Sequence, residues 1–222
     1  MTAPILTVDA RDVYDRALLR AAAGDRVLLT LRDERGQEHR ADPGRWCRAE
    51  VPGDAGLLAR CGGPALDLGC GPGRLTAGLN RLGRPALGID VSAAAVLLAR
   101  LRGAPALRRD LFDPLPGHGR WHDLLLADGN IGIGGDPAAL LRRCRELLGR
   151  DGRVHVEVAR PGTRSWSGPA TLSTAPDFSD AAPMHWAAVA VDDLSALAGA
   201  AALRTLTTWA EAGRWFATLA AA

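Results

Sequence analysis

The chain has 222 residues, of which 47% are hydrophobic and 23% charged, and its formal net charge is +2. These values are typical of a globular protein with a single hydrophobic core, and so small a net charge gives no reason to expect a nucleic-acid partner. All 27 basic residues are Arg. Together with the abundant Ala and Gly, this excess is typical of coding bias in a GC-rich, bacterial-type genome and is weak support for phosphate recognition.

The cysteines and the apolar segments bear on metal binding and location. Four cysteines, at 47, 61, 70 and 144, form no C-x-x-C pair or Cys/His cluster in the sequence, so we expect neither a metal site nor a disulfide framework. The stretch MTAPILTVDARD lacks the basic and apolar regions of a signal peptide. Every apolar run is too short to cross a bilayer. We therefore expect a cytoplasmic protein with no membrane partner.

The first 60 residues precede any regular alternation of elements and predict an N-terminal extension or lid. The elements expected there are a helix over 7–23, a hairpin over 26–41, a loop over 42–47, and a helix over 54–61 capped by Asp54. Residues 61–222 are expected to form the core of the same single domain, which spans 1–222.

From residue 64 onward, short apolar strands alternate with amphipathic helices. Strands are expected at 65–69, 86–90, 106–109, 122–128 and 152–159, and helices at 73–82, at 93–102 with Ser92 as cap, and at 137–148 with Asp136 as cap. Near-continuous apolar strands separated by helices indicate a parallel sheet covered on both faces. Right-handed crossovers then give a doubly wound α/β sheet.

The C-terminal third departs from this rhythm. Residues 160–183, rich in Pro, Gly, Ser, Thr and Asp, predict a long loop with little regular structure. Residues 185–191 predict a further strand, with a helix as the alternative, and a capped helix is expected over 192–202. The last two strand-like runs are joined by a short turn, which predicts an antiparallel hairpin at the sheet edge.

The stretch ALDLGCGPGR (65–74) turns a strand tightly into a helix. A dinucleotide fingerprint would need glycine at position 74, where the chain has Arg74, and Pro72 lacks the N–H that could cradle a pyrophosphate. A P-loop is excluded because the chain contains no lysine. The ligand is therefore expected to approach the turn closely and to carry no phosphate.

Asp90 ends the next expected strand, where an acidic side chain can accept both hydroxyls of a ribose. At this point the sequence resembles the class I S-adenosylmethionine-dependent methyltransferases, whose motif hhDhGxGxG is matched by ALDLGCGPG. The resemblance implies a Rossmann-like, mostly parallel seven-stranded sheet. It also implies S-adenosyl-L-methionine as methyl donor and S-adenosyl-L-homocysteine as product. ADGNIGIGGDP (127–137) resembles a group of uncharacterised bacterial small methyltransferases.

The resemblance assigns a set of residues to the donor. They are Asp67, Gly69, Cys70, Gly71, Gly73, Asp90, Val91, Asp110, Leu111, Phe112, Asp128, Gly129 and Asn130. In this set Asp110 would contact the adenine amino group, Leu111 would offer a backbone N–H to the ring, and Phe112 an apolar contact. The segment 127–137 lacks the NPPY-type motif of nucleobase amino-methyltransferases, which disfavours nucleobase acceptors.

Methyl transfer is an in-line displacement, so holding donor and acceptor in line is the main requirement. Asp128, Glu157 and His185 are the candidate catalytic residues; Asp128 holding its own glycine-rich loop is the competing interpretation. The aromatic residues Trp46, Trp166, Phe178 and Trp186 fall outside the predicted core elements and could line an acceptor pocket or simply pack.

The leading hypothesis is a methyltransferase for a small-molecule acceptor, without a metal ion. The alternatives are a donor-binding but inactive partner module, a protein or RNA methyltransferase, and, less consistent with Pro72 and Arg74, a nicotinamide-dependent oxidoreductase. Neither the acceptor nor the methylated atom follows from the sequence. The oligomeric state is also open, with a homodimer as one option.

Overall fold

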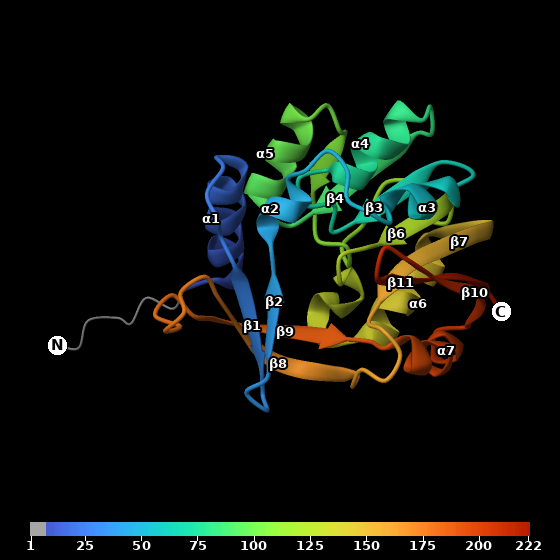
Figure 1. Cartoon of the computed structure of the whole chain (residues 1–222). Coiled ribbons are helices and arrows are strands. Elements are labelled where there is room, and N and C mark those ends of the chain that lie inside the picture. The colour runs from blue at the N-terminus through green and yellow to red at the C-terminus, as the bar shows by residue number, and fades with distance from the viewer. Residues whose placement is uncertain (1–7) are drawn as a thin grey trace.

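The fold combines one large sheet, one small sheet and helices packed on both faces of the large sheet (Figure 1). The computed structural model describes residues 8–222. Its helices are α1 (Ala10–Ala22), α2 (Pro43–Trp46), α3 (Asp54–Ala59), α4 (Arg74–Arg81), α5 (Ala93–Leu101), the 3-10 helix η1 (Asn130–Gly135), α6 (Pro137–Leu147) and α7 (Val191–Ala200). Its strands are β1 (Leu29–Asp33), β2 (Glu38–Ala41), β3 (Ala65–Leu68), β4 (Ala86–Asp90), β5 (Ala106–Arg108), β6 (Trp121–Leu126), β7 (Leu148–Val158), β8 (Trp166–Ser173), β9 (Ala182–Ala188), β10 (Leu203–Glu211) and β11 (Arg214–Ala221).

The large sheet has seven strands in the order β10-β11-β7-β6-β3-β4-β5. Strands β7, β6, β3, β4 and β5 are parallel neighbours, whereas β11 pairs antiparallel with both β7 and β10. Helices α3, α4 and α5 lie on one face, and α6 and α7 on the other (Figure 1). The predicted doubly wound, mostly parallel seven-stranded sheet with its C-terminal hairpin is confirmed.

The central strand β6 shows why these apolar runs form buried strands. Leu124 and Leu126 pack in one core cluster with Leu140 of α6, and the intervening Leu125 packs in a second cluster with Leu79 of α4. Successive side chains of a strand point to opposite faces, so a strand covered on both faces must be apolar at every position. The sheet core is thus fixed by the near-continuous apolar runs visible in the sequence.

A second, four-stranded antiparallel sheet in the order β2-β1-β8-β9 was not predicted. The expected hairpin over 26–41 is confirmed as β1 and β2, but the expected long loop over 160–183 is wrong, since it contains β8 and the start of β9. Pro169 is one of the residues that made this segment resemble a loop, although it lies within β8. It lies beyond the end of β1, where β8 pairs only with β9, so its missing N–H removes no bond to β1.

The helix boundaries follow local capping chemistry. Ser92 caps α5 by accepting from the N–H of Ala95, and Asp136 caps α6 by accepting from the N–H of Ala139, both at 2.9 Å, as predicted. Helix α1 begins at Ala10, and residue 7 of the predicted helix lies outside the described residues. Of the predicted strand over 185–191, only the part up to residue 188 is strand, and α7 begins at residue 191.

Two local expectations are wrong. Residues 42–47 contain the short helix α2, capped by Asp42, which accepts from the N–H of Gly44 at 2.9 Å. Asp54 is the first residue of α3 and not its cap; that position is taken by Gly53, with φ of 94°. The Asp54 carboxylate is turned inward, where it accepts from the N–H of Val51 at 2.8 Å and pairs with arginines.

No helix within residues 8–222 combines the length and apolar character needed to cross a bilayer.

Gly73 provides a test of how α4 packs. Its φ is +76°, and a Cβ there would lie 2.8 Å from the Ala99 Cβ and 2.9 Å from the Ala104 Cβ. We expect Gly73→Ala to lower the free energy of unfolding by about 3 kcal/mol, from left-handed strain plus overpacking. Gly83→Ala is the matched control: its φ is +72° with nothing within 4 Å of the added Cβ, and it should cost only about 1 kcal/mol. Equal losses in urea titrations would contradict this packing role.

Candidate functional site

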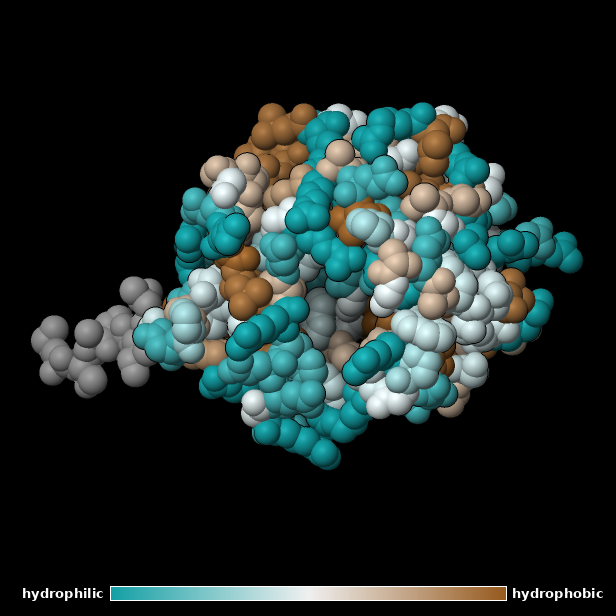
Figure 2. All heavy atoms as spheres, in the orientation of Figure 1, coloured by the Kyte–Doolittle hydropathy of each residue, from teal (hydrophilic) through white to brown (hydrophobic). Residues whose placement is uncertain are grey.

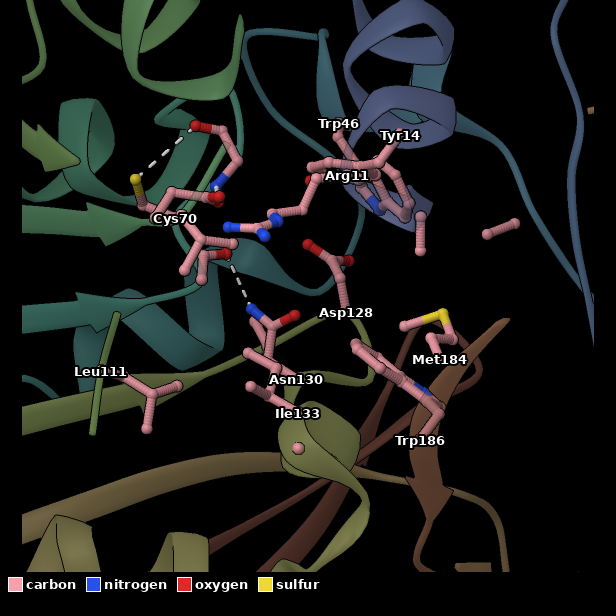
Figure 3. Close-up of a pocket in the computed structure, with 18 of the residues that line it drawn as sticks. Arg11, Tyr14, Trp46, Cys70, Leu111, Asp128, Asn130, Ile133, Met184 and Trp186 are labelled. Carbon is pink, nitrogen blue, oxygen red and sulfur yellow. Dashed lines mark hydrogen bonds between the residues drawn. The ribbon is translucent and has the colours of Figure 1, made fainter. Parts of the chain in front are cut away.

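A cavity of about 470 Å³ opens at the carboxyl ends of β3, β4 and β6, between the large and the small sheet. Ligands in open α/β sheets bind at this edge. Figure 2 shows the surface hollowed between the two sheets, with mainly hydrophilic residues around the opening. Figure 3 shows Tyr14 and Trp46 on one side, Met184 and Trp186 opposite them, and Asp128 and Asn130 between.

The glycine turn forms one wall of the cavity. Gly69 and Gly71 both line it with positive φ, 74° and 51°. A Cβ on Gly69 would lie 2.7 Å from the Asn130 side-chain nitrogen, so only glycine fits there. On Gly71 the same atom would project toward the Tyr14 hydroxyl, 3.6 Å away. The predicted close approach to the backbone is therefore available at residues 69–71. Gly73, which the resemblance assigned to the donor, is not among the lining residues and serves to pack α4 against α5.

Asp90 is held rigidly at the end of β4. Its carboxylate accepts from the N–H of Gly71 and from the N–H of Ser92, each at 2.9 Å, and only 7% of the residue is exposed. Burial raises the pKa of Asp90 above its ordinary value. Val91, Asp110, Leu111 and Phe112 line the same end of the cavity. The predicted ribose acid and the predicted adenine contacts thus meet in one place.

Asp67 lies beneath the glycine turn. It is 2% exposed, lines the cavity, and accepts a hydrogen bond from the Thr76 hydroxyl at 2.7 Å. Burial raises the pKa of Asp67 to about 6. Its charge is therefore sensitive to pH and to a nearby cation.

Five charged side chains form a network behind the cavity: Asp54, Arg74, Asp128, Glu157 and Arg214. Arg214 contacts Asp54 at 2.8 Å, Glu157 at 2.7 Å and Asp128 at 3.3 Å, and Arg74 pairs with both Asp54 and Asp128. The two arginines are 4% and 5% exposed. Although burial alone would raise it, pairing with Arg74 holds the pKa of Asp54 below its ordinary value. Buried charges of this kind are tolerated because each is paired and hydrogen-bonded.

The network determines how two of the candidate catalytic residues are placed. Asp128 lines the cavity, but its two carboxylate oxygens are paired with Arg214 and Arg74. Glu157 is not among the lining residues; its carboxylate accepts from the N–H of Asp128 at 2.6 Å and from Arg214. Gly129, with φ of 86°, also lies off the cavity wall. A proton taken up by either carboxylate would leave a buried guanidinium short of a partner, which is costly.

Asn130 holds the glycine turn in place. Its side-chain amide donates to the carbonyls of Leu68 and Gly69 at 2.9 and 2.8 Å. Asn130 also lines the cavity, and both of these hydrogen bonds use only its side-chain nitrogen.

His185, the third candidate, borders the cavity from β9. The antiparallel register pairs it with Pro169, whereas Met184 pairs with Ala170 and Trp186 with Gly168. Because strand side chains alternate, His185 lies on the face opposite to Met184 and Trp186. It is exposed. The register thus directs it away from the wall that Met184 and Trp186 form.

Sequence reasoning missed three residues that shape the site. Tyr14 reaches the glycine turn from α1, and burial raises the pKa of its hydroxyl well above the ordinary value. Arg74 was noted only as a departure from the dinucleotide motif, although its position directly after the last glycine places it under the cavity. Arg214 reaches the network from the final hairpin, and no local pattern marked it.

A separate buried cluster joins Cys61, Asp123 and His155. His155 contacts Asp123 at 2.9 Å and Thr218 at 3.1 Å, and Asp123 also accepts from the N–H groups of residues 62 and 63. Hydrogen bonds within the protein thus occupy the His155 imidazole and the Asp123 carboxylate, which is consistent with a structural role for this cluster.

The comparisons with known proteins agree with this geometry. Residues 66–156 match the family model described as a methyltransferase domain. Residues 66–156 are therefore similar in sequence to a methyltransferase domain. This match confirms the resemblance first seen in the glycine motif. The domain includes β3 to β7, and therefore the glycine turn, Asp90 and Asp128.

Relatives of the methyltransferase domain have varied substrates. The chain is 27% identical over 120 residues to a ubiquinone biosynthesis O-methyltransferase of Yersinia enterocolitica, and it spans about half (50%) of the length of that curated relative. A methyltransferase from Bacteroides fragilis, solved with S-adenosyl-L-homocysteine, has the same fold, with a TM-score of 0.78, 20% identity and 96% of each chain covered. The 1,6-didemethyltoxoflavin N1-methyltransferase of Burkholderia thailandensis gives a TM-score of 0.55, 19% identity and 75% coverage of each chain.

The network gives a prediction about stability. We expect Arg214→Met to lower the free energy of unfolding by roughly 3–5 kcal/mol, because it leaves Glu157 without its arginine and Asp54 and Asp128 with Arg74 alone. Arg20→Met is the matched control, since the exposed Arg20–Asp25 pair should contribute at most about 1 kcal/mol. Chemical denaturation of both variants measures the difference. A loss for Arg214→Met no larger than that for the control would show that the network is not stabilising.

Proposed function

We propose that this protein transfers the methyl group of S-adenosyl-L-methionine to a small-molecule acceptor. The observation that carries the proposal is Asp90, hydrogen-bonded to Gly71 and facing a cavity whose glycine turn admits a ligand without phosphate. The family match over residues 66–156 supports the same donor. The Bacteroides fragilis neighbour, solved with S-adenosyl-L-homocysteine, adds support through its fold.

The cavity offers a partner for each part of the donor. Asp90 would accept hydrogen bonds from the ribose hydroxyls, and Asp110, Leu111 and Phe112 would border the adenine. Asp67 lies beneath the turn, where its carboxylate would attract the donor's ammonium group. The network adds charge complementarity, because three carboxylates face two guanidinium groups and leave an excess negative charge beside a cationic donor.

The chain's contribution to the chemistry is alignment. When bound, the donor supplies an electrophilic methyl group: a lone pair of the acceptor forms the new bond as the carbon–sulfur bond breaks, and the bonding pair stays on sulfur. The acceptor's proton passes to water. The glycine turn and Asp90 fix the donor, and holding the reactants in line can contribute about 7–11 kcal/mol to lowering the barrier. We assign Asp128 and Glu157 to positioning, because their carboxylates are bound to arginines.

The position of the cavity favours a small molecule over a protein or RNA acceptor. It lies between two sheets and is bordered by α1 and α2, so a residue of a folded protein or a stacked base would have to enter past them. Two relatives are named for small-molecule substrates, ubiquinone and toxoflavin precursors. An inactive donor-binding module remains the alternative, and turnover of any acceptor distinguishes the two.

Donor binding is the direct test. Titration calorimetry should show binding of both S-adenosylmethionine and S-adenosylhomocysteine, and Asp90→Asn should weaken it at least tenfold because the neutral amide is a poorer acceptor for two ribose hydroxyls. Asp113→Asn, an exposed change near the same edge, is the control. No binding of either ligand to the unmodified protein would refute the proposed function. Unchanged affinity in Asp90→Asn would refute only the ribose assignment.

The raised pKa of Asp67 predicts a pH dependence. Because its pKa is about 6, the carboxylate that attracts the donor's ammonium is mostly protonated at pH 5, and donor affinity should be roughly tenfold lower there than at pH 8. Asp67→Asn should remove this dependence. The stability of the protein without donor should change with pH in the opposite direction. Because the pKa of Asp67 in the folded chain lies above its ordinary value, the free energy of unfolding should fall as the pH rises from about 4 toward 6. A flat affinity profile in the unmodified protein would contradict the assignment.

A further inference from the structure

The cavity has two chemically different halves. Four carboxylates line it, and all of them lie on or shortly after strands of the large sheet: Asp67, Asp90, Asp110 and Asp128. Among the described residues that line it from α1, α2 and the small sheet, none is acidic. If the donor occupies the first half, as the proposed function requires, its methyl group can be transferred only to a molecule lying against the second half.

The register of the small sheet explains the second half. Leu31 pairs with Leu172, Leu29 with Ala41, and Ala170 with Met184, so one face of the sheet carries the apolar side chains of every strand. The same face also carries His39, opposite Leu31, and Asp33, opposite Ala170, and these two polar side chains lie 3.7 Å apart. The opposite face carries Thr30, Arg32, Glu38, Thr171 and Pro183. We call the apolar side chains of this face that line the cavity the acceptor wall. It consists of Leu29, Leu31, Ala41, Leu172, Met184 and Trp186, faced by Tyr14 and Trp46.

The arginines near the acceptor wall already have acidic partners. Arg11 and Arg40 line the cavity, but their side chains are 61% and 65% exposed, and they are paired with Asp9 and Glu38. Arg74 is buried, but Asp54 and Asp128 already pair with it. A charged acceptor lying against the wall would therefore lose its hydration, and an anion would also have to displace a carboxylate from one of these arginines, which is unfavourable.

Aromatic and sulfur-containing side chains set the shape of the acceptor. The Tyr14 and Trp46 rings lie with centroids 6.0 Å apart on one side, and Met184 and Trp186 lie across the cavity (Figure 3). Flat rings gain from offset or edge-to-face contact with such side chains, and thioethers contact ring edges favourably. A flexible polar chain would gain little from these surfaces.

We propose that the acceptor is an uncharged molecule with an apolar aromatic ring body, held between the acceptor wall and the Tyr14–Trp46 pair. This inference rests on the proposed function and adds the class of its substrate. The specificity of the reaction then lies in the small sheet, and donor affinity is independent of it.

The test uses the protein saturated with S-adenosylhomocysteine and three probes of one shape: naphthol (neutral), naphthoate (anionic) and naphthylmethylammonium (cationic). We expect naphthol to bind in titration calorimetry at least tenfold more tightly than either charged probe. An equal or tighter affinity for a charged probe would overturn the proposal, as would the absence of binding by all three. Failure of the proposed function itself would appear separately, as no binding of S-adenosylhomocysteine to the unmodified protein.

A pair of variants assigns the effect to the wall. Leu31→Asp places a charge on the apolar face and should weaken naphthol binding at least tenfold. Thr171→Asp places the same charge on the outer face of the neighbouring strand and should leave naphthol binding unchanged. Met184→Ala, which introduces no charge, should also weaken naphthol binding. The affinity for S-adenosylhomocysteine should stay unchanged in all three variants. Unchanged naphthol affinity in both Leu31→Asp and Met184→Ala would show that the wall does not bind the ring.

Discussion

The pairing of Arg74 and Arg214 with three carboxylates is the interaction on which the site depends. It joins α3, α4, β7, β11 and the turn after β6, segments that are distant in the sequence. Asp128 has a positive φ of 52°, unusual for a residue other than glycine, and its ion pairs offset the strain of that conformation. The turn it begins leads into η1 and carries Asn130 to the carbonyls of Leu68 and Gly69. The glycine turn therefore owes its position to a buried electrostatic network and not only to its own flexibility.

Local sequence patterns predicted the large sheet well because its determinants are local. Each core strand is an apolar run that must be covered on both faces, and Ser92 and Asp136 cap helices through bonds to residues three positions away. Asp90 and the glycine motif were placed together correctly because each lies at the carboxyl end of one of two neighbouring parallel strands, β4 and β3. The small sheet was missed because β8 is stabilised by pairing with β1 and β9, and its Gly168 and Pro169 favour a turn when the segment is considered without these partners.

The candidate catalytic residues show a second limit of reading one sequence. Asp128 and Glu157 are polar groups at strand ends, where a site residue and an ion-pair partner look identical; only the fold brings Arg74 and Arg214 to them. For His185 the limit is a different one. Its strand was recognised, but strand alternation places it opposite to Met184 and Trp186, and which face is inward depends on the unpredicted sheet. The one residue within reach of sequence reasoning was Arg74, directly beside the glycine motif.

The two halves of the cavity are encoded in different parts of the chain. The residues that we propose to bind the donor fall within 66–156, the segment that matches the methyltransferase domain, whereas β1, β2, β8 and β9 lie on either side of it. Two hairpins that flank the domain in sequence thus meet in space as one sheet over the donor edge (Figure 1). Since methyl transfer depends on alignment more than on a catalytic group, changing this sheet can change the acceptor without altering the donor machinery. Relatives that align with half of the chain can therefore share the donor while differing in acceptor, and on our proposal the small sheet determines the acceptor of this protein.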